Sequence, residues 1–233
     1  ARAKELTPVQ IRDRLGQRFE LLRQGRRGQS DRQSSLRGLI DWSWELLEPW
    51  EQAALAQLSV FHDGFSMEAA EAVLDLSPWP DAPWSLDVVG SLLDKSLVHA
   101  RDIRGHNRLS MYVSIQEYAA QKLGDQTSVT ASRHASFFSK FGAVSYLDST
   151  STHGGVQRFQ VLITELENLL AGLNAALKAG NLSVAAQCGI AAAEVFQMHG
   201  PTVPGLELIE RLLAQPVTGQ VRARLHLLGG QLL

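Results

Sequence analysis

The residue types that most often do chemistry in proteins are histidine, cysteine and paired carboxylates, and this sequence contains all of them. It has seven histidines, spread along the chain. His62 falls in an expected turn, His99 and His106 in an expected β-hairpin, and His134 before an aromatic pair on an expected helix. No two are spaced as metal ligands usually are. We therefore expect surface histidines or buried histidines that have a hydrogen-bond partner.

The other candidate groups also lack a catalytic arrangement. Glu165 and Glu167 are two positions apart, so on a helix they point to different faces and are poorly placed as an acid/base pair. Glu68 and Glu71 share a face, which we interpret as a solvated stripe. Cys188 lies among small residues, and a buried, unreactive thiol is expected there.

Sequence motifs that bind phosphate or zinc are also absent. The chain contains no G-x-x-x-x-G-K-[ST], no G-x-G-x-x-G and no H-E-x-x-H. We therefore predict no catalytic residue, no bound cofactor and no metal in these residues, and we do not expect this chain to be an enzyme.

Composition indicates an ordinary globular chain. Its 233 residues are 45% hydrophobic with a formal net charge of -2, enough for one or two domains. The single cysteine excludes an intramolecular disulfide and favours a reducing compartment, so we expect the cytoplasm. The chain lacks a run of 18 apolar residues, so we expect no contact with a membrane. It also lacks an initiator methionine, so we expect it to be a piece of a longer protein.

Positive charge is concentrated at the start. Residues 1–37 carry ten Lys or Arg against four Asp or Glu. Much of it lies in a loop predicted over residues 23–35, with Arg23, Arg26, Arg27 and Arg32. Such a segment can bind nucleic acid, meet an acidic neighbouring domain or simply face water, and all three remain open.

Helical spacing and capping residues predict a series of short helices in the first half. The predicted helices cover 7–23, then Ser34 or Ser35 to Leu47, 48–60, and 67–76 after a Ser66 cap. A loop with three prolines follows over 77–85, and then a helix over 86–96. Trp42 and Trp50 alternate with Leu and Ile at helical spacing, so we predict core positions, although tryptophans can also stack on single-stranded nucleic acid.

A β-hairpin is predicted next. "SLVHARD" and "NRLSMYV" alternate apolar and polar residues, and Gly105 and Asn107 suit a tight turn between them. Helices followed by a hairpin over about 97–112, and by one more helix over 114–124, indicate a winged helix.

From residue 128 onward only helices are predicted, over 129–147, 156–180, 182–200, 203–215 and 220–233. Their lengths and their Gly, Asn and Pro punctuation suit antiparallel pairs in a tetratricopeptide-like array. The predicted fold class is therefore mainly α, with a winged helix bearing a small β-hairpin followed by an antiparallel helical array. The predicted boundaries are 1–33, 34–125 and 126–233.

A winged helix raises the question of DNA binding. The helix before the hairpin carries one lysine against two aspartates, and residues 67–76 are acidic, which phosphate would repel. The hairpin is better equipped, with Arg101, Arg104 and Arg108. The sequence favours a winged helix that meets protein over one that reads DNA.

Several segments resemble the STAND class of regulatory ATPases, the bacterial relatives of NB-ARC proteins. "LRGLIDWSWELLEPWEQAALAQLSVFHDGFSMEAAEAV" is similar to the class pattern "LR..I.WS..LL...E...L..L.VF.GGF...AAEAV". "LLDKSLV", "SIQEYAAQKL", "RHASFF" and "ELENLLAGLNAALKAGN" continue the resemblance, which covers most of residues 1–230.

The resemblance implies a mechanical role. In such proteins the winged helix docks on an upstream nucleotide-binding domain and relays its ADP or ATP state to a helical array that receives a protein or small-molecule effector. Residues 1–33 would be the end of the helical lid domain and a basic linker. ATP or ADP and Mg²⁺ would bind the parent protein upstream, and this part would hold no catalytic residue.

One departure from the class affects nucleotide sensing. Where relatives carry a polar triplet, alignment on "QEYAA" places Met111, Tyr112 and Val113. Val113 has no hydrogen-bonding side chain, which argues against direct sensing of the nucleotide by this winged helix. Two alternatives stay open: a DNA-binding winged-helix transcription regulator, and a stand-alone peptide-binding helical scaffold.

Overall fold

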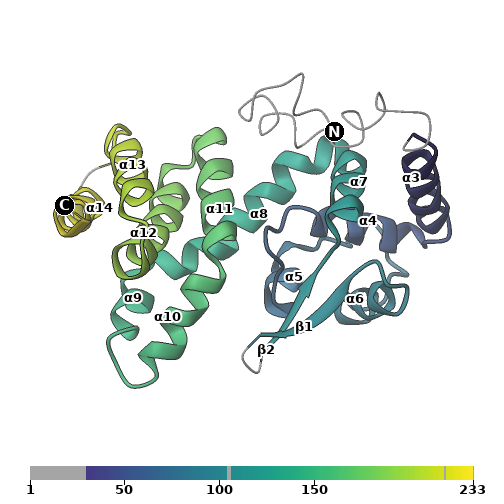
Figure 1. Ribbon diagram of the computed structural model, residues 1–233, viewed down its shortest axis with the longest axis horizontal. Helices are drawn as coiled ribbons and strands as arrows, with labels where there is room; N and C mark the ends of the chain where they lie inside the picture. The colour runs from purple at the N-terminus through teal and green to yellow at the C-terminus, as the bar shows by residue number, and fades with distance from the viewer. Residues whose placement is uncertain (1–29, 104–105, 218, 233) are drawn as a thin grey trace.

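The structure is a computed structural model that describes residues 30–103, 106–217 and 219–232. Over these residues the chain is mainly α-helical with one small antiparallel sheet, which confirms the predicted fold class. Figure 1 shows the hairpin and the first helices on one side, with the later helices on the other. The helix predicted over 7–23 lies outside the described residues, as does the basic loop up to residue 29.

The first half has the element order of a winged helix. Its elements are α3 (Ser30–Glu45), α4 (Pro49–Leu58), α5 (Met67–Val73), α6 (Ser85–Asp94), β1 (His99–Ile103), β2 (His106–Ser110) and α7 (Val113–Leu123). The predicted Ser66 cap forms, whereas the cap predicted at Ser34 or Ser35 does not, because α3 already begins at Ser30. The Glu48 amide donates to the carboxylate of Glu51 at 2.8 Å, and the Ser66 hydroxyl accepts from the amide of Ala69 at 3.1 Å. Local sequence therefore determines where α4 and α5 begin.

The sheet consists of the predicted hairpin and one additional bridge. β1 and β2 are antiparallel, with Arg101 opposite Arg108. Phe65, in the connection between α4 and α5, also pairs with Leu109 through two backbone hydrogen bonds of 2.8 and 2.9 Å. This bridge fastens the hairpin to the α4–α5 connection.

Helix α3 differs from the prediction at its start. It begins at Ser30, within the segment predicted to be a loop, because the polar residues of 30–35 do not prevent a helix from forming. Trp42 was predicted to be a core residue, and this is wrong, since it is 62% exposed. Leu36, Leu39, Trp42 and Leu46 lie three or four positions apart and form an exposed apolar stripe. Helical spacing identified the apolar face but could not show that it points outward.

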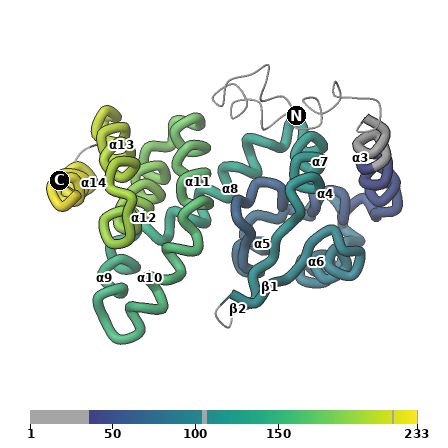
Figure 2. The backbone as a smooth tube through the Cα atoms, viewed as in Figure 1, coloured from purple at the N-terminus to yellow at the C-terminus, as the bar shows by residue number. Residues whose placement is uncertain are grey.

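The second half is an array of helices. Its elements are α8 (Thr127–Ser139), the 3₁₀ turn η3 (Lys140–Gly142), α9 (Val144–Ser149), α10 (Gly155–Thr164), α11 (Leu166–Lys178), α12 (Leu182–His199), α13 (Thr202–Leu213) and α14 (Gly219–Leu232). Helices α11 to α14 stack in chain order, each against the next, as Figure 2 shows. This is the arrangement in which each helix buries its apolar face against a neighbour.

Two of the predicted long helices are broken. The helix predicted over 129–147 ends at Ser139, and the chain passes through η3 before α9. Gly142 lies directly against the backbone of Gln187 in α12, which leaves no room for a side chain. The helix predicted over 156–180 is interrupted at Glu165, whose φ of -96° and ψ of 8° leave the helical region. Neither break follows a proline.

One hydrophobic core runs through both halves. Val73 of α5, Phe138 of α8 and Leu169 of α11 belong to the same buried cluster, and α8 contacts both α5 and α11. Between α7 and α8 lies only the short turn η2 (Gly124–Gln126), where a domain boundary was predicted. None of the described helices is both long and apolar enough to cross a membrane.

Candidate functional site

The most connected polar residues lie where the hairpin meets the helical array, and Arg108 is at their centre. Strand β2 places Arg108 beside the turn before Phe65, because Leu109 pairs with Phe65. Its Nε donates to the carbonyl of Asp63 at 2.7 Å, and its Nη2 donates to the carbonyl of Gly64 at 3.0 Å. The guanidinium therefore fixes the turn as well as the strand.

The same guanidinium reaches into the array. Nη1 lies 2.7 Å from Oε1 of Glu165, and Nη2 lies 3.2 Å from Oε2 and from the carbonyl of Thr164. Both side chains of the ion pair are only 7% exposed. The break between α10 and α11 falls at Glu165, which faces this guanidinium. A bidentate ion pair of this kind fixes both the distance between the two side chains and their relative orientation.

Gly64 makes the close approach possible. Its φ is +85°, in the left-handed region, and a Cβ there would lie 2.5 Å from the carbonyl oxygen of Leu109. Only glycine fits this turn. The turn that was predicted at His62 therefore also sets the distance between the α4–α5 connection and the hairpin.

Asn168, in the first turn of α11, joins the turn to the array a second time. It is fully buried, and its amide accepts from the backbone of His62 at 2.8 Å. It donates to the carbonyl of Gly64 at 2.9 Å and to Oε2 of Glu165 at 2.8 Å. Its Oδ1 also lies 3.1 Å from Nε2 of His134. Every polar atom of this amide is thus occupied.

His134 is therefore a buried histidine with a partner, one of the two outcomes predicted for it. Because Oδ1 of Asn168 can only accept, Nε2 of His134 carries the hydrogen. Burial lowers the pKa of His134 to about 4, while the bond to Asn168 acts in the opposite direction. Its ring packs against Phe61 and Phe138, with centroids 5.2 and 4.6 Å away. It is neutral at pH 7.

The position of Arg108 corrects the expectation that it equips the hairpin for DNA. It is 6% exposed and its charge is used inside the protein. Arg101, opposite it, is exposed, and Arg104 lies outside the described residues. Because the two are cross-strand partners, they lie on the same face of the sheet; they differ because Arg108, on β2, meets the turn at Asp63 and Glu165 of the array.

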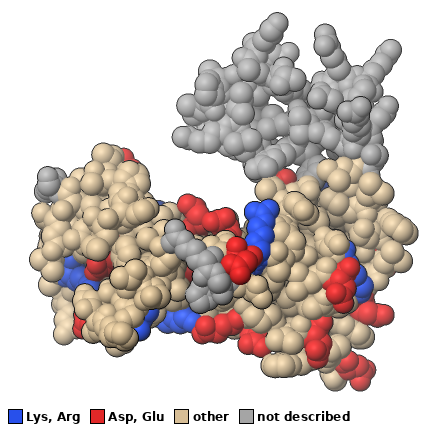
Figure 3. Space-filling model, turned by 60° about the horizontal axis from the view of Figure 1, so that its bottom comes forward, with Lys and Arg blue, Asp and Glu red and all other residues tan. Residues whose placement is uncertain are grey.

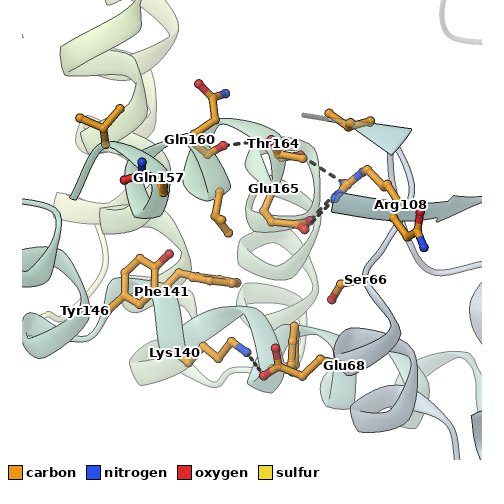
Figure 4. A pocket seen from close by; sticks show the side chains of 15 residues that line it. Ser66, Glu68, Arg108, Lys140, Phe141, Tyr146, Gln157, Gln160, Thr164 and Glu165 are labelled. Carbon is orange, nitrogen blue, oxygen red and sulfur yellow. Dashed lines mark hydrogen bonds and ion pairs between the residues drawn. The ribbon is translucent and has the colours of Figure 1, made fainter. Parts of the chain in front are cut away.

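Two pockets flank the junction. The larger, of about 650 Å³, opens between the hairpin, α5, η3 and α10, and Arg108 and Glu165 form part of its wall (Figure 4). The smaller, of about 410 Å³, is lined by residues of the hairpin and by the Met111–Tyr112–Val113 segment. Arg108 lines both pockets.

His99 stands out in the smaller pocket. Its ring stacks on Tyr112 with centroids 4.6 Å apart, and its Nε2 lies 2.9 Å from the hydroxyl of Ser110. Its Nδ1 is buried and has no hydrogen-bond partner among the described residues. Burial and the charge of Arg101 lower the pKa of His99. Val113 begins α7 and is 46% exposed.

The face of α6 carries negative charge and apolar groups. Asp87 and Asp94 are exposed. Lys95, just after the helix, forms an ion pair with Glu51, in which Nζ of the lysine lies 2.6 Å from Oε2 of the glutamate. Trp84, next to the start of the helix, is 65% exposed. Figure 3 shows several acidic side chains along the lower right of the view, with fewer basic ones among them.

The remaining sequence candidates stay apart. Glu165 is buried and Glu167 exposed, as two residues on different faces should be. Glu68 forms a surface ion pair with Lys140 at 2.6 Å, while Glu71 is exposed. Cys188 is buried, and burial raises the pKa of its thiol to about 12. No cluster of potential metal ligands occurs among the described residues.

The partnership of Arg108, Glu165 and Asn168 was not predicted. A signal was present, because Glu165, Asn168 and Leu169 lie on the buried side of this stretch together with Leu162. A charged residue and an amide on a core-facing stripe require partners. The sequence could not name those partners, because they lie in the hairpin and in the preceding turn.

Comparison with known proteins found relatives that are much longer than this chain. "Putative HTH-type transcriptional regulator Rv0890c" of Mycobacterium tuberculosis is 34% identical over 192 residues, which are 80% of this chain and 21% of that protein. "Putative HTH-type transcriptional regulator Mb0914c" of Mycobacterium bovis has the same values. "Uncharacterized protein Rv0894" of Mycobacterium tuberculosis is 32% identical over 132 residues, 56% of this chain and 33% of that protein.

No family model and no solved structure matches the chain. The chain spans about a fifth of the length of the first two relatives, which are 34% identical to it over 80% of its residues. It is thus similar to one segment of proteins that are named as regulators of transcription.

Proposed function

We propose that this chain is the non-catalytic relay and protein-interaction portion of a STAND-type signal-transduction regulator in the cytoplasm. In this proposal the winged helix docks on an upstream nucleotide-binding domain of the same polypeptide, which holds ATP or ADP with Mg²⁺. The helical array receives the effector. The resemblance of "LRGLIDWSWELL" and the following segments supports it, as do relatives named as transcriptional regulators.

The observation that carries the proposal is the junction centred on Arg108. In a relay, a change in the position of one element must move the next element, which requires a rigid contact between the two. Here one buried guanidinium holds the hairpin, the turn at 63–64 and the start of α11 together. A movement of the hairpin must therefore move α11, or break a buried ion pair that is costly to break.

The surface of α6 supports contact with protein rather than with DNA. A helix that enters the major groove needs cations for phosphate and polar side chains for base edges. The exposed charges of α6 are Asp87 and Asp94, and the exposed Trp84 lies beside them. Tryptophan is enriched at protein interfaces, and charged groups are found mainly at their rims.

The relay is tested first by reading the coding sequence upstream of Ala1. A G-x-x-x-x-G-K-[ST] motif after a predicted strand is expected there. The parent protein would then be loaded with a fluorescent ADP analogue, and its release measured for the wild type and for Arg108→Met/Glu165→Leu. Release is expected to change several-fold in the double variant and not in Arg101→Met. Equal rates in all three proteins would contradict the relay.

A second candidate function is a winged helix that binds DNA directly, and the names of the relatives favour it. Fluorescence anisotropy of a labelled duplex with residues 1–233, at 50 and 200 mM salt, separates the two. The relay proposal predicts no binding that falls steeply with salt. Binding that weakens by orders of magnitude over this range would support the DNA-binding function instead.

A further inference from the structure

The larger pocket is placed and sized to receive a small molecule. Its volume of about 650 Å³ is within the range of small-molecule sites. One wall comes from the winged helix, with Ser66, Ile103 and Asn107, and the other from η3, α9 and α10. Both halves of the protein therefore contribute to one cavity beside the Arg108 ion pair.

Part of the wall is aromatic. Phe141 and Tyr146 meet edge to face with centroids 4.9 Å apart, and Phe137 meets Phe141 in the same way at 6.4 Å. The Tyr146 hydroxyl donates to the carbonyl of Arg158, and burial raises the pKa of Tyr146 to about 12. This wall therefore presents apolar ring surface without a phenolate, and it suits a flat ring.

The charges that line the pocket are neutralised in pairs. Arg108 is held by Glu165 at 2.7 Å. Lys140 is held by Glu68 at 2.6 Å, and its Nζ also lies 3.7 Å from the ring centroid of Phe137. Figure 4 shows both ion pairs at the edges of the pocket. An ionic ligand would have to displace one partner of a pair, so the site suits an uncharged molecule.

Hydrogen-bonding groups are nevertheless available. Gln157 and Gln160 lie one helical turn apart on α10 and both line the pocket. Among the described residues, neither side-chain amide has a hydrogen-bond partner, and neither is a buried unsatisfied group. An amide can both donate to and accept from an amide or hydroxyl on a ligand.

We propose that this pocket binds an uncharged small molecule that contains an aromatic ring and an amide or hydroxyl group. The ring packs on Phe141 and Tyr146, and the polar group is recognised by Gln157 and Gln160. Because both halves form the walls, the bound molecule favours their present arrangement by mass action. Binding itself does not depend on the relay function, whereas its interpretation as an effector signal rests on that proposal.

Ligand-observed saturation-transfer NMR on residues 1–233 tests the chemistry of the site. The probes are benzamide, benzoate and benzylamine, each at 5 mM, which share a ring and differ in charge. Transfer to benzamide is expected to be at least threefold stronger than transfer to either charged probe. Equal or stronger transfer to benzoate or benzylamine would overturn the proposal, as would no transfer to benzamide at all.

Two variants locate the binding. Val161→Trp fills the pocket from α10 and is expected to abolish transfer to benzamide, whereas Val203→Trp, at an exposed position of α13, leaves it unchanged. If Val161→Trp lowers the melting temperature, Gln157→Leu/Gln160→Leu replaces it as the test. In that double variant, saturation transfer to benzamide is expected to be at least threefold weaker, and transfer to toluene is expected to be unchanged. Benzamide transfer that survives these changes would place the probe elsewhere and overturn the proposal.

Discussion

Arg108 and Glu165 are 57 positions apart in the chain, yet Nη1 of the arginine lies 2.7 Å from Oε1 of the glutamate, and both side chains are almost fully buried. The pair joins the hairpin of the winged helix to the start of α11. Asn168 accompanies it by bonding both Glu165 and the carbonyl of Gly64. The hairpin and the array are thus held by groups that would be costly to leave unpaired.

Removing one partner of this pair should destabilise the protein strongly. Arg108→Met leaves a buried carboxylate without its cation, and we expect it to lower the free energy of unfolding by about 3–5 kcal/mol. Replacing both partners, as in Arg108→Met/Glu165→Leu, should restore much of the lost free energy of unfolding. Urea unfolding followed by circular dichroism measures both. Arg101→Met, on the exposed neighbouring strand position, should stay within about 0.5 kcal/mol of the wild type.

The stability of the protein should fall as the pH is lowered from 6.5 toward 4. The native pKa of His134 is about 4, below the ordinary value of 6.5, so the unfolded chain binds a proton that the native state does not. This favours unfolding by about 2 kcal/mol at pH 5 relative to pH 7.5. The lowered pKa values of Glu51 and Asp75 act in the same direction, because the unfolded chain binds protons at these carboxyl groups more readily than the native state does.

His134→Gln tests the assignment, because it removes the titrating group and keeps a donor for Asn168. Urea unfolding of wild type and variant should be compared at pH 7.5 and pH 5. The variant should be less stable at pH 7.5, and most of the pH dependence should disappear. An undiminished fall in the variant would assign the effect to other groups.

Two glycine substitutions should have opposite effects. Gly142→Ala places a methyl group against the backbone of Gln187, so η3 and α12 must separate, and we expect a loss of about 2 kcal/mol or more. Gly38→Ala, in α3 with no atom of the described residues within 4 Å of the added methyl group, should stabilise the protein by about 0.5–1 kcal/mol. Thermal unfolding of both variants under one set of conditions makes the comparison.

The thiol of Cys188 should be unreactive while the protein is folded. It is fully buried, and burial raises its pKa to about 12, so almost no thiolate is present at pH 8. We expect modification by dithiobis(nitrobenzoic acid) to be at least a hundredfold slower than in 6 M guanidinium chloride. A fast reaction in native buffer would mean that α12 opens locally.

Charge on α6 should control DNA binding. Asp87→Lys/Asp94→Lys turns its exposed face basic, and we expect weak duplex binding that falls as salt rises from 50 to 200 mM. Glu207→Lys/Glu210→Lys makes the same change of charge on exposed positions of α13 and should bind less tightly. Anisotropy of a labelled duplex measures both, and equal binding by the two variants would exclude a role for the position of α6.

The sequence predicted those elements whose signals are local. The Ser66 cap, the pairing of β1 with β2 and the end of α7 before Gly124 depend on neighbouring residues, and each is found where it was expected. The interruption at Glu165 was not predicted, because the chain there contains neither glycine nor proline. Its partner Arg108 lies in a different half of the protein, and only tertiary packing brings the two together.

Exposure was harder to predict than helix formation. Trp42 and Ile40 are two positions apart on α3, and only Ile40 is buried. The α3 face with Asp41 is held by the Tyr118 hydroxyl, which donates to the Asp41 carboxylate at 2.6 Å. That contact spans 77 positions, so the orientation of the helix depends on a partner that spacing along α3 cannot reveal.

Helix α8 packs against α5 and α11 at once, and Asn168 bonds the backbone at residues 62 and 64. A gene fusion that joined this array to a different winged helix at residue 126 would sever these contacts and expose Phe138. Evolution by domain shuffling would therefore have to move the hairpin, α8 and α11 together.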